Sequence, residues 1–271
     1  MHEHALSQQF ESFSTLEIAV SDSSDGYAQM KNSGFVQAAL NGNRIHPAVP
    51  RTPAELAKDT QLAVRAGASS VHVHPYDDHG CETLEPKYCA AALLAMRAAC
   101  PGIPISLSTS ATIEPDPERR VALVKSWTVV PDLVTVNQGE SGIIELITVL
   151  RSKNICIEAG LLSLGDAELF VRSDIAPHCA RIMVEPLDES ANDAVLHAEA
   201  IENLLADHQI ALQQVHHGEG IALWSVTRRA IKRGHGIRTG LEDTPIMPDG
   251  SLAPDNEQLV LAALALYPKM G

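Results

Sequence analysis

The fold is decided by residues 35–75, which read FVQAALNGNRIHPAVPRTPAELAKDTQLAVRAGASSVHVHP. This stretch begins with an apolar run of β type, continues with helical spacing, and ends on a second β-type run. Thr52 stands at the N-cap position of the helix, and Pro53 and Glu55 complete the start signal. Gly67 ends the segment. Strand, helix and strand in this order predict a parallel βαβ unit.

The same alternation continues to the C-terminus. Strands are expected over residues 35–40, 69–74, 104–108, 132–137, 155–160, 181–186, 211–217 and 236–242. Helices are expected over residues 52–67, 86–100, 116–126, 141–152, 166–172, 190–208, 221–233 and 254–267. Eight strands, each followed by a helix, predict a (β/α)8 TIM barrel. A doubly wound open sheet is the alternative, but the first strand-to-helix turn has no G-x-G-x-x-G.

The chain divides into two parts at residue 34. Residues 1–33 are rich in Ser, Asp and Gln without a sustained period, and we interpret them as an N-terminal arm. No linker or change of composition interrupts the chain after Gly34. We therefore expect one TIM-barrel catalytic domain over residues 34–271.

Composition excludes several classes of partner. The formal net charge of −14, without a cluster of Lys, Arg and aromatic residues, argues against nucleic acid. No apolar run approaches ~20 residues and no signal peptide is evident, so no membrane association is expected. The five cysteines are odd in number and form no CxxC pair, which favours a reducing, cytoplasmic location.

Two histidines close the second expected strand. His72 and His74 alternate, so both side chains point to the same side of the strand. In a TIM barrel the functional groups lie at the C-terminal ends of the strands, which is where these residues fall. They are candidate ligands of a divalent metal, although His2 and His4 share the spacing. The alternative is one buried, hydrogen-bonded histidine and one surface histidine.

A carboxylate ligand is available from the last strand. Arg238, Glu242 and Asp243 cluster at its end, two places around the ring from the strand that carries His72. Two histidines and one carboxylate form a common catalytic zinc set with an open position. The alternative is that Arg238 and the two acids form a structural ion pair.

Further polar groups end the strands in between. Glu158 lies in an apolar run and should meet a cation, for which Arg238 is the expected partner. Neutral hydroxyl groups suited to holding a carboxylate follow strands three and four, or else serve as helix caps: Ser108, Thr109, Ser110 and Thr135. Three more residues could build a second metal site or a general base, although a structural role is the preferred interpretation: Glu185, His216 and His217.

The sequence resembles the β-keto acid cleavage enzymes from about Phe35 to the C-terminus. Four motifs carry this resemblance: AALNG (38–42), VPRTPAELA (49–57), AGASSVHVH (66–74) and IRTGLED (237–243). The order and spacing of these motifs are more specific than any one of them.

The resemblance implies a zinc-dependent TIM barrel that exchanges acyl groups between a β-keto acid and acetyl-CoA and releases acetoacetate. It implies one Zn²⁺ per chain, acetyl-CoA as co-substrate, and a homo-oligomer, either a tetramer or a dimer. The implied zinc ligands are His72, His74 and Glu242; the implied catalytic group is Glu158, Arg238 and Asp243; the implied contacts to the substrate carboxylate are Ser108, Ser110 and Thr135.

Two segments depart from the family pattern. The loop after the second strand reads PYDDHG (75–80) in place of a basic loop, and STSA (108–111) replaces a glycine-rich turn. Both bear on substrate choice and on CoA use. Two other functions stay open: a zinc hydrolase of a small ester, amide or lactone on the same barrel, and a non-catalytic barrel that binds a small acid.

Overall fold

The eight expected strands are all present and close into a barrel. The computed structural model describes residues 34–268, so the arm expected over residues 1–33 lies outside the described residues. Neighbouring strands follow the sequence order, and β8 pairs in parallel with β1. The strands are β1 Val36–Ala39, β2 Ser70–Val73, β3 Ile105–Ser108, β4 Leu133–Asn137, β5 Cys156–Leu161, β6 Arg181–Val184, β7 Gln213–His216 and β8 Gly236–Thr239. The (β/α)8 TIM barrel is confirmed.

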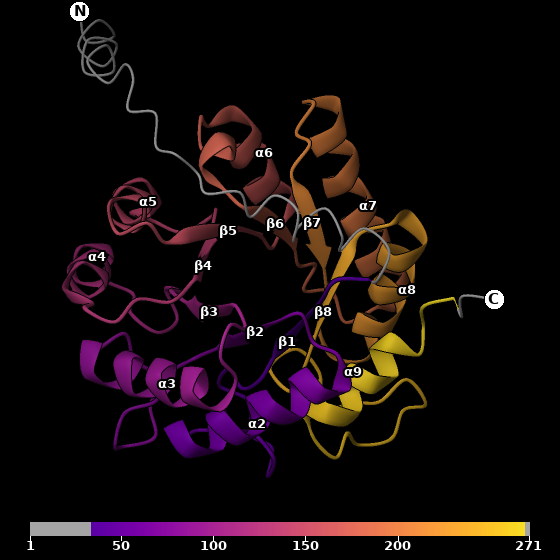
Figure 1. Ribbon diagram of the computed structural model, residues 1–271. Helices are drawn as coiled ribbons and strands as arrows, with labels where there is room; N and C mark the ends of the chain where they lie inside the picture. Colours follow the sequence, from indigo (N-terminus) through magenta and orange to yellow (C-terminus); the bar gives the residue numbers. More distant parts are fainter. Residues whose placement is uncertain (1–33, 269–271) are drawn as a thin grey trace, which may run out of the picture. The chain divides into compact units, whose positions relative to one another are not determined.

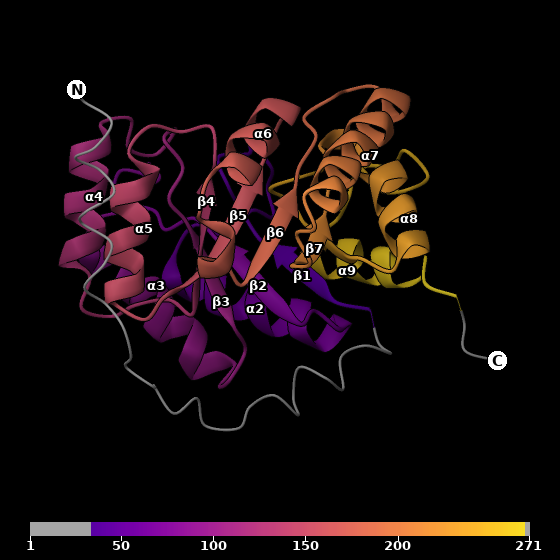
Figure 2. The ribbon, with the colours of Figure 1, turned by 90° about the horizontal axis from the view of Figure 1, so that it is seen from above.

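Helices form the outer layer around the strands, as Figure 1 and Figure 2 show. They are α2 Pro53–Ala66, α3 Pro86–Ala99, α4 Pro117–Ser126, α5 Ile143–Ser152, α6 Leu164–Arg172, α7 Ala191–Asp207, α8 Leu223–Arg233 and α9 Asn256–Leu264, with 3-10 turns at Ala176–His178 and Gly220–Ala222. α9 packs against α2 and completes the ring of helices (Figure 1). Within residues 34–268, no helix has both the length and the apolar character needed to span a bilayer.

The predicted start and end of α2 are confirmed. The Thr52 side chain accepts from the Glu55 amide at 3.3 Å, and the Glu55 carboxylate accepts from the Thr52 amide at 2.9 Å. Gly67 ends the helix in the left-handed conformation, with φ at 114°. These ends fix the position of α2 in the chain between β1 and β2. They also fix where the loop from β1 to α2 ends.

Residues of β2 alternate between the barrel interior and the helix layer. Val71 and Val73 belong to the large hydrophobic cluster between strands and helices, and both are fully buried. With a period of two, His72 and His74 therefore face the interior. The predicted common direction of the two histidines is confirmed.

The barrel interior is largely polar. Its apolar part is a small cluster of Phe35, Met183 and Val215. The polar side chains within the barrel are each at most 7% exposed: Gln37, His72, Ser106, Thr135, Glu158, Arg181 and Arg238. Because TIM-barrel interiors are usually filled by branched apolar side chains, this polar interior indicates a functional site or its support.

The last strand is shorter than expected. β8 ends at Thr239, so Glu242 and Asp243 lie in the turn beyond it and not in the strand. Gly240 starts this turn, and a Cβ atom there would lie 1.9 Å from the carbonyl oxygen of Ala39. The close approach lets the chain cross the end of β1, where the Glu242 amide donates to the same carbonyl at 3.3 Å. The turn thereby carries both acids over the mouth.

Candidate metal centre at the barrel mouth

Glu242 converges at the mouth with His72 of β2 and with His74, which directly follows that strand. Oε1 of Glu242 lies 3.7 Å from Nε2 of His72 and 3.4 Å from Nε2 of His74. One ligand atom from each of the three residues falls within 4.8 Å of the others. Two imidazole nitrogens and a carboxylate oxygen at this separation suit a zinc ion with one open position.

Polar atoms of this cluster lack other partners, which fits a bound cation. Among residues 34–268, Nε2 of His74 and Oε2 of Glu242 are buried without a hydrogen-bond partner. Leaving such atoms buried and unpaired is costly, and a metal ion would remove that cost. The donor set and the orphaned atoms both fit zinc.

The AALNG motif holds the ligands in place. The Asn41 side chain accepts from the His74 amide at 2.8 Å and donates to the His74 carbonyl at 2.7 Å. Gly42 packs against Glu242, and a Cβ atom on it would lie 2.7 Å from Cγ of that residue. The motif therefore joins the ends of β1 and β2 and leaves room for the Glu242 side chain.

The second nitrogen of each histidine has its own partner. Nδ1 of His72 lies 3.1 Å from the Ser106 hydroxyl. Nδ1 of His74 lies 2.5 Å from Oε1 of Glu82, in the loop after β2. Sequence reasoning missed Glu82, because it lies in a loop and no motif links it to a histidine eight residues earlier.

Arg238 connects Glu242 to Asp243. Its Nη2 atom lies 2.5 Å from Oε1 of Glu242 and 2.7 Å from Oδ1 of Asp243. Burial alone would raise the pKa of Glu242, but Arg238 and the two histidines hold it well below its usual range. Burial raises the pKa of Asp243, although Arg238 opposes this. The pKa values of the two neighbouring carboxyl groups are thus shifted in opposite directions, toward the anion for Glu242 and toward the protonated form for Asp243.

The expected pairing of Glu158 with Arg238 is wrong. Glu158 forms an ion pair with Arg181 at 2.8 Å and accepts from Gln37 at 2.8 Å. The strand register explains this, because Glu158 on β5 is level with Arg181 on β6. Arg238 is committed to the two acids that follow its own strand.

The three hydroxyl groups expected to hold a carboxylate have different surroundings. The Thr135 hydroxyl donates to Glu158 at 3.1 Å, and the Ser110 hydroxyl donates to Glu140 at 3.3 Å. The Ser108 hydroxyl accepts from the Ser110 amide at 3.3 Å, which leaves its own proton available. Of the three, Ser108 is the best placed to donate to a ligand.

Of the three residues for which a structural role was the preferred interpretation, His217 lies against Asp243 and also contacts Glu185. Nδ1 of His217 is 3.5 Å from Oδ1 of Asp243, and its Nε2 is 3.3 Å from Oε2 of Glu185. His216, by contrast, stacks on His235 with ring centroids 4.5 Å apart, in line with a structural role. The alternation of β7 explains the difference, since His216 and His217 point to opposite sides.

Arg44 also contributes at the mouth and was not predicted. It donates from Nη2 to the backbone carbonyl of Glu242 at 2.9 Å and contacts Glu219 at 3.2 Å. The guanidinium group thus holds the turn that carries the candidate metal ligand Glu242. Its place in an irregular loop left no periodic signal to predict this.

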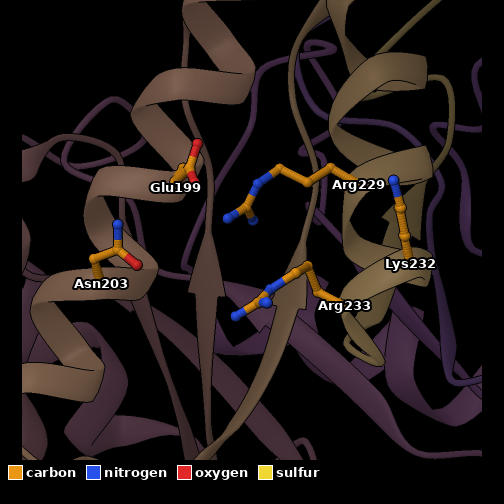
Figure 3. Close-up of a pocket in the computed structure, with 5 residues that line it drawn as sticks. All are labelled: Glu199, Asn203, Arg229, Lys232 and Arg233. Carbon is orange, nitrogen blue, oxygen red and sulfur yellow. The ribbon is translucent and has the colours of Figure 1, made fainter.

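A hollow lies on the outer wall of the barrel, between α7 and α8. Figure 3 shows Arg229 and Arg233 of α8 pointing toward α7, which contributes Glu199 and Asn203. Both arginines form ion pairs with Glu202, whose carboxylate lies 2.5 Å from Arg229 and 2.7 Å from Arg233. We assign this cluster to the stability of the fold.

Replacing Glu202 by glutamine should destabilise the protein. Burial alone would raise the pKa of Glu202, but bonds from Arg233, His235 and Arg229 lower it to about 2. A lowered pKa means that the stabilisation is present above the unfolded value of about 4.3 and is lost as the pH falls toward 2. After a discount for solvent screening, the shift corresponds to roughly 1–2 kcal/mol at pH 7, or a fall in Tm of roughly 2–8 °C.

Thermal unfolding at pH 7 and pH 3 checks this expectation. Glu199→Gln is the matched control, since Glu199 lines the same hollow on the exposed face of α7, and its effect should stay within about 0.5 kcal/mol. An unchanged Tm for Glu202→Gln at pH 7 would refute the stabilising role.

Comparisons with known proteins cover most of the chain. The family described as beta-keto acid cleavage enzyme matches residues 34–160 and 187–271. The 3-keto-5-aminohexanoate cleavage enzyme of Fusobacterium nucleatum is 24% identical over 88% of this chain and 92% of its own length. The 3-oxoadipate:acetyl-CoA acetyltransferase of Cupriavidus necator is 27% identical over 87% of each chain.

Solved structures support the fold. A ternary complex of ObcA with a C4-CoA adduct and oxalate superposes with a TM-score of 0.65 at 17% identity, and covers 80% of this chain. A binary complex of ObcA with oxaloacetate gives a TM-score of 0.64 at 16% identity over 79% of this chain. This chain spans only 63% and 62% of those two chains.

Proposed function

The chain belongs to the β-keto acid cleavage enzyme family, and on this premise we propose that it exchanges acyl groups between a β-keto acid and acetyl-CoA. The products are acetoacetate and a new acyl-CoA, and the reaction depends on one zinc ion per chain. The names of the two relatives support the reaction class, since one is a β-keto acid cleavage enzyme and the other an acetyl-CoA acetyltransferase.

One observation carries the proposal: Arg238 joins the metal cluster to a buried carboxyl group. Asp243 lies 2.7 Å from an arginine nitrogen that also lies 2.5 Å from the metal ligand Glu242. A bound zinc ion would act as a Lewis acid on the keto oxygen of the substrate. A proton acceptor next to that position is what the cleavage of a β-keto acid requires.

Asp243 takes and returns one proton in the proposed sequence. It removes a proton from the carbon between the keto and carboxylate groups, and the electron pair of that C–H bond forms a new C–C bond to the acetyl carbonyl carbon. The C–S bond of acetyl-CoA breaks, and the released thiolate adds to the keto carbon. The old C–C bond then breaks and leaves the acyl group on CoA. Its electron pair takes the proton back from Asp243, which gives acetoacetate.

Other residues hold the reacting groups. Arg238 and His217 orient Asp243 through contacts to the same carboxylate oxygen, Oδ1. Ser108 donates to the substrate carboxylate, while Thr135 within β4 and Ser110 in the loop after β3 complete its surroundings. This division agrees with the hydrogen bonds of the three hydroxyl groups.

Product analysis with and without acetyl-CoA tests the proposal. The substrate panel should contain β-keto acids with an amino, a carboxylate and an apolar distal end, because the names of the two relatives specify an aminated and a dicarboxylic substrate. Acetoacetate and a new acyl-CoA should form only when acetyl-CoA is present. Turnover of an ester, amide or lactone without acetyl-CoA, and no exchange on any keto acid, would favour the zinc hydrolase instead.

A further inference from the structure

The tautomer of each metal-binding histidine depends on the partner of its second nitrogen. An imidazole binds a metal through a ring nitrogen that carries no proton, so the other nitrogen of the neutral ring must be protonated. In His72 and His74, Nε2 faces Glu242, at 3.7 and 3.4 Å. Metal binding at this position therefore requires the proton on Nδ1 of both rings.

Glu82 meets this requirement for His74. Its Oε1 atom lies 2.5 Å from Nδ1 of His74, and an ionised carboxylate can only accept a hydrogen bond. The Nδ1 atom must therefore donate. This contact is charge-assisted, which makes it stronger than a contact to a neutral group.

The loop that carries Glu82 is fixed by its own hydrogen bonds. Glu82 forms an antiparallel bridge with Tyr76, and the Thr83 amide donates to the Pro75 carbonyl at 2.9 Å. Across the loop, the Asp77 amide donates to the Cys81 carbonyl at 2.8 Å. The Glu82 side chain is only 12% exposed. The loop therefore positions the Glu82 carboxylate beside His74 even when no ligand is bound.

Glu158 meets the same requirement for His72, through Ser106. The Ser106 hydroxyl donates its single proton to Oε2 of Glu158. It can therefore only accept at Nδ1 of His72, which lies 3.1 Å away. Glu158 itself is fixed by Arg181 and Gln37, both at 2.8 Å. The Ser106 hydroxyl thus links the Glu158–Arg181 ion pair to His72.

We propose that Glu82 and Glu158, neither of which is a ligand, fix the tautomers of His74 and His72 and thereby present both Nε2 lone pairs to the metal. This inference rests on the metal centre of the proposed function. It makes Glu158 a positioning residue, in place of the expected catalytic role. Glu82 also adds a second negative charge beside that of Glu242, which balances a divalent ion.

Two variants test the two halves of this proposal. Glu82→Gln keeps the shape of the side chain but replaces the carboxylate by a neutral amide. Ser106→Ala breaks the link to His72 while leaving the Glu158–Arg181 pair intact, which a change at Glu158 would not do. Competition of each apoprotein with a chromogenic chelator for zinc gives the dissociation constant, which should rise roughly 10- to 100-fold for Glu82→Gln and by a similar or smaller factor for Ser106→Ala.

Matched controls separate this effect from general damage. Glu85→Gln makes the same change three residues along the chain, where the side chain makes no capping hydrogen bond. Ser70→Ala removes a buried hydroxyl on the same strand as His72, one that has no partner among residues 34–268. Both controls should stay within about twofold of the parent. The absorption spectrum of the cobalt-loaded protein should change in the two test variants and stay constant in the controls.

The zinc affinity of the variants tests the roles of Glu82 and Glu158, whereas zinc binding by the parent protein tests the metal centre itself. Zinc affinities of Glu82→Gln and Ser106→Ala equal to that of the parent would overturn the inference and leave the metal centre in place. A parent protein that binds no zinc would overturn the zinc dependence of the proposed function and the inference with it.

Discussion

Replacing Asp243 by asparagine is expected to leave the zinc content unchanged and to lower the rate of acyl exchange by roughly 10²- to 10⁴-fold. Asparagine has nearly the same shape and still accepts a hydrogen bond from Arg238. It cannot take a proton, however, so the substrate carbon keeps its hydrogen and the new C–C bond does not form. Asp243 is 5% exposed, so bulk water cannot easily replace it.

Metal analysis of the purified variant together with its kcat checks this result. Asp249→Asn is the matched control, because Asp249 lies in the same connection between β8 and α9 but is exposed and bound to Ser251. The control should retain the parent rate. Turnover retained by Asp243→Asn at normal zinc content would remove Asp243 from the proton-transfer role.

Replacing Glu242 by glutamine should abolish both zinc binding at stoichiometric loading and acyl exchange. The change removes the only anionic ligand of the set and leaves the positive charge of Arg238 facing the metal position at close range. Two histidines beside an arginine whose charge is then balanced by Asp243 alone make a poor site for a divalent cation.

The metal-free state can also be prepared from the parent protein. Treatment with a chelator should remove the activity, and added zinc should restore it in the parent but not in Glu242→Gln. Glu219→Gln is the control, since Glu219 lies near the same turn, contacts Arg44 and is 52% exposed. Full activity in zinc-free parent protein would contradict the assignment of the metal.

The sequence predicted the fold well because its signals are local. Each signal involves only a few neighbouring residues. Examples are the helix caps Thr52 and Gly67 and the alternation from Val71 to His74. The candidate metal cluster could also be predicted, because the C-terminal ends of all strands of a TIM barrel, β2 and β8 included, lie at the same mouth. Closure of the barrel is then sufficient to bring its three residues together.

The supporting contacts could not be predicted in the same way. The partner of Glu158 depends on the register between β5 and β6, which brings Arg181 level with it. Glu82 reaches His74 through a loop whose conformation comes from backbone hydrogen bonds and not from a period. Asn41 acts through hydrogen bonds to the backbone of His74. Such bonds produce no characteristic residue spacing in the sequence.

The fate of labelled acetyl-CoA tests the central claim most directly. The protein is incubated with a β-keto acid that it converts and with acetyl-CoA carrying ¹³C in both acetyl carbons, and the acetoacetate is analysed by NMR. Acyl exchange predicts that the label lies in the methyl and keto carbons of acetoacetate and that the methylene and carboxylate carbons come from the unlabelled keto acid. Label that stays in acetyl-CoA or appears in free acetate, with no labelled acetoacetate, would contradict the proposed reaction.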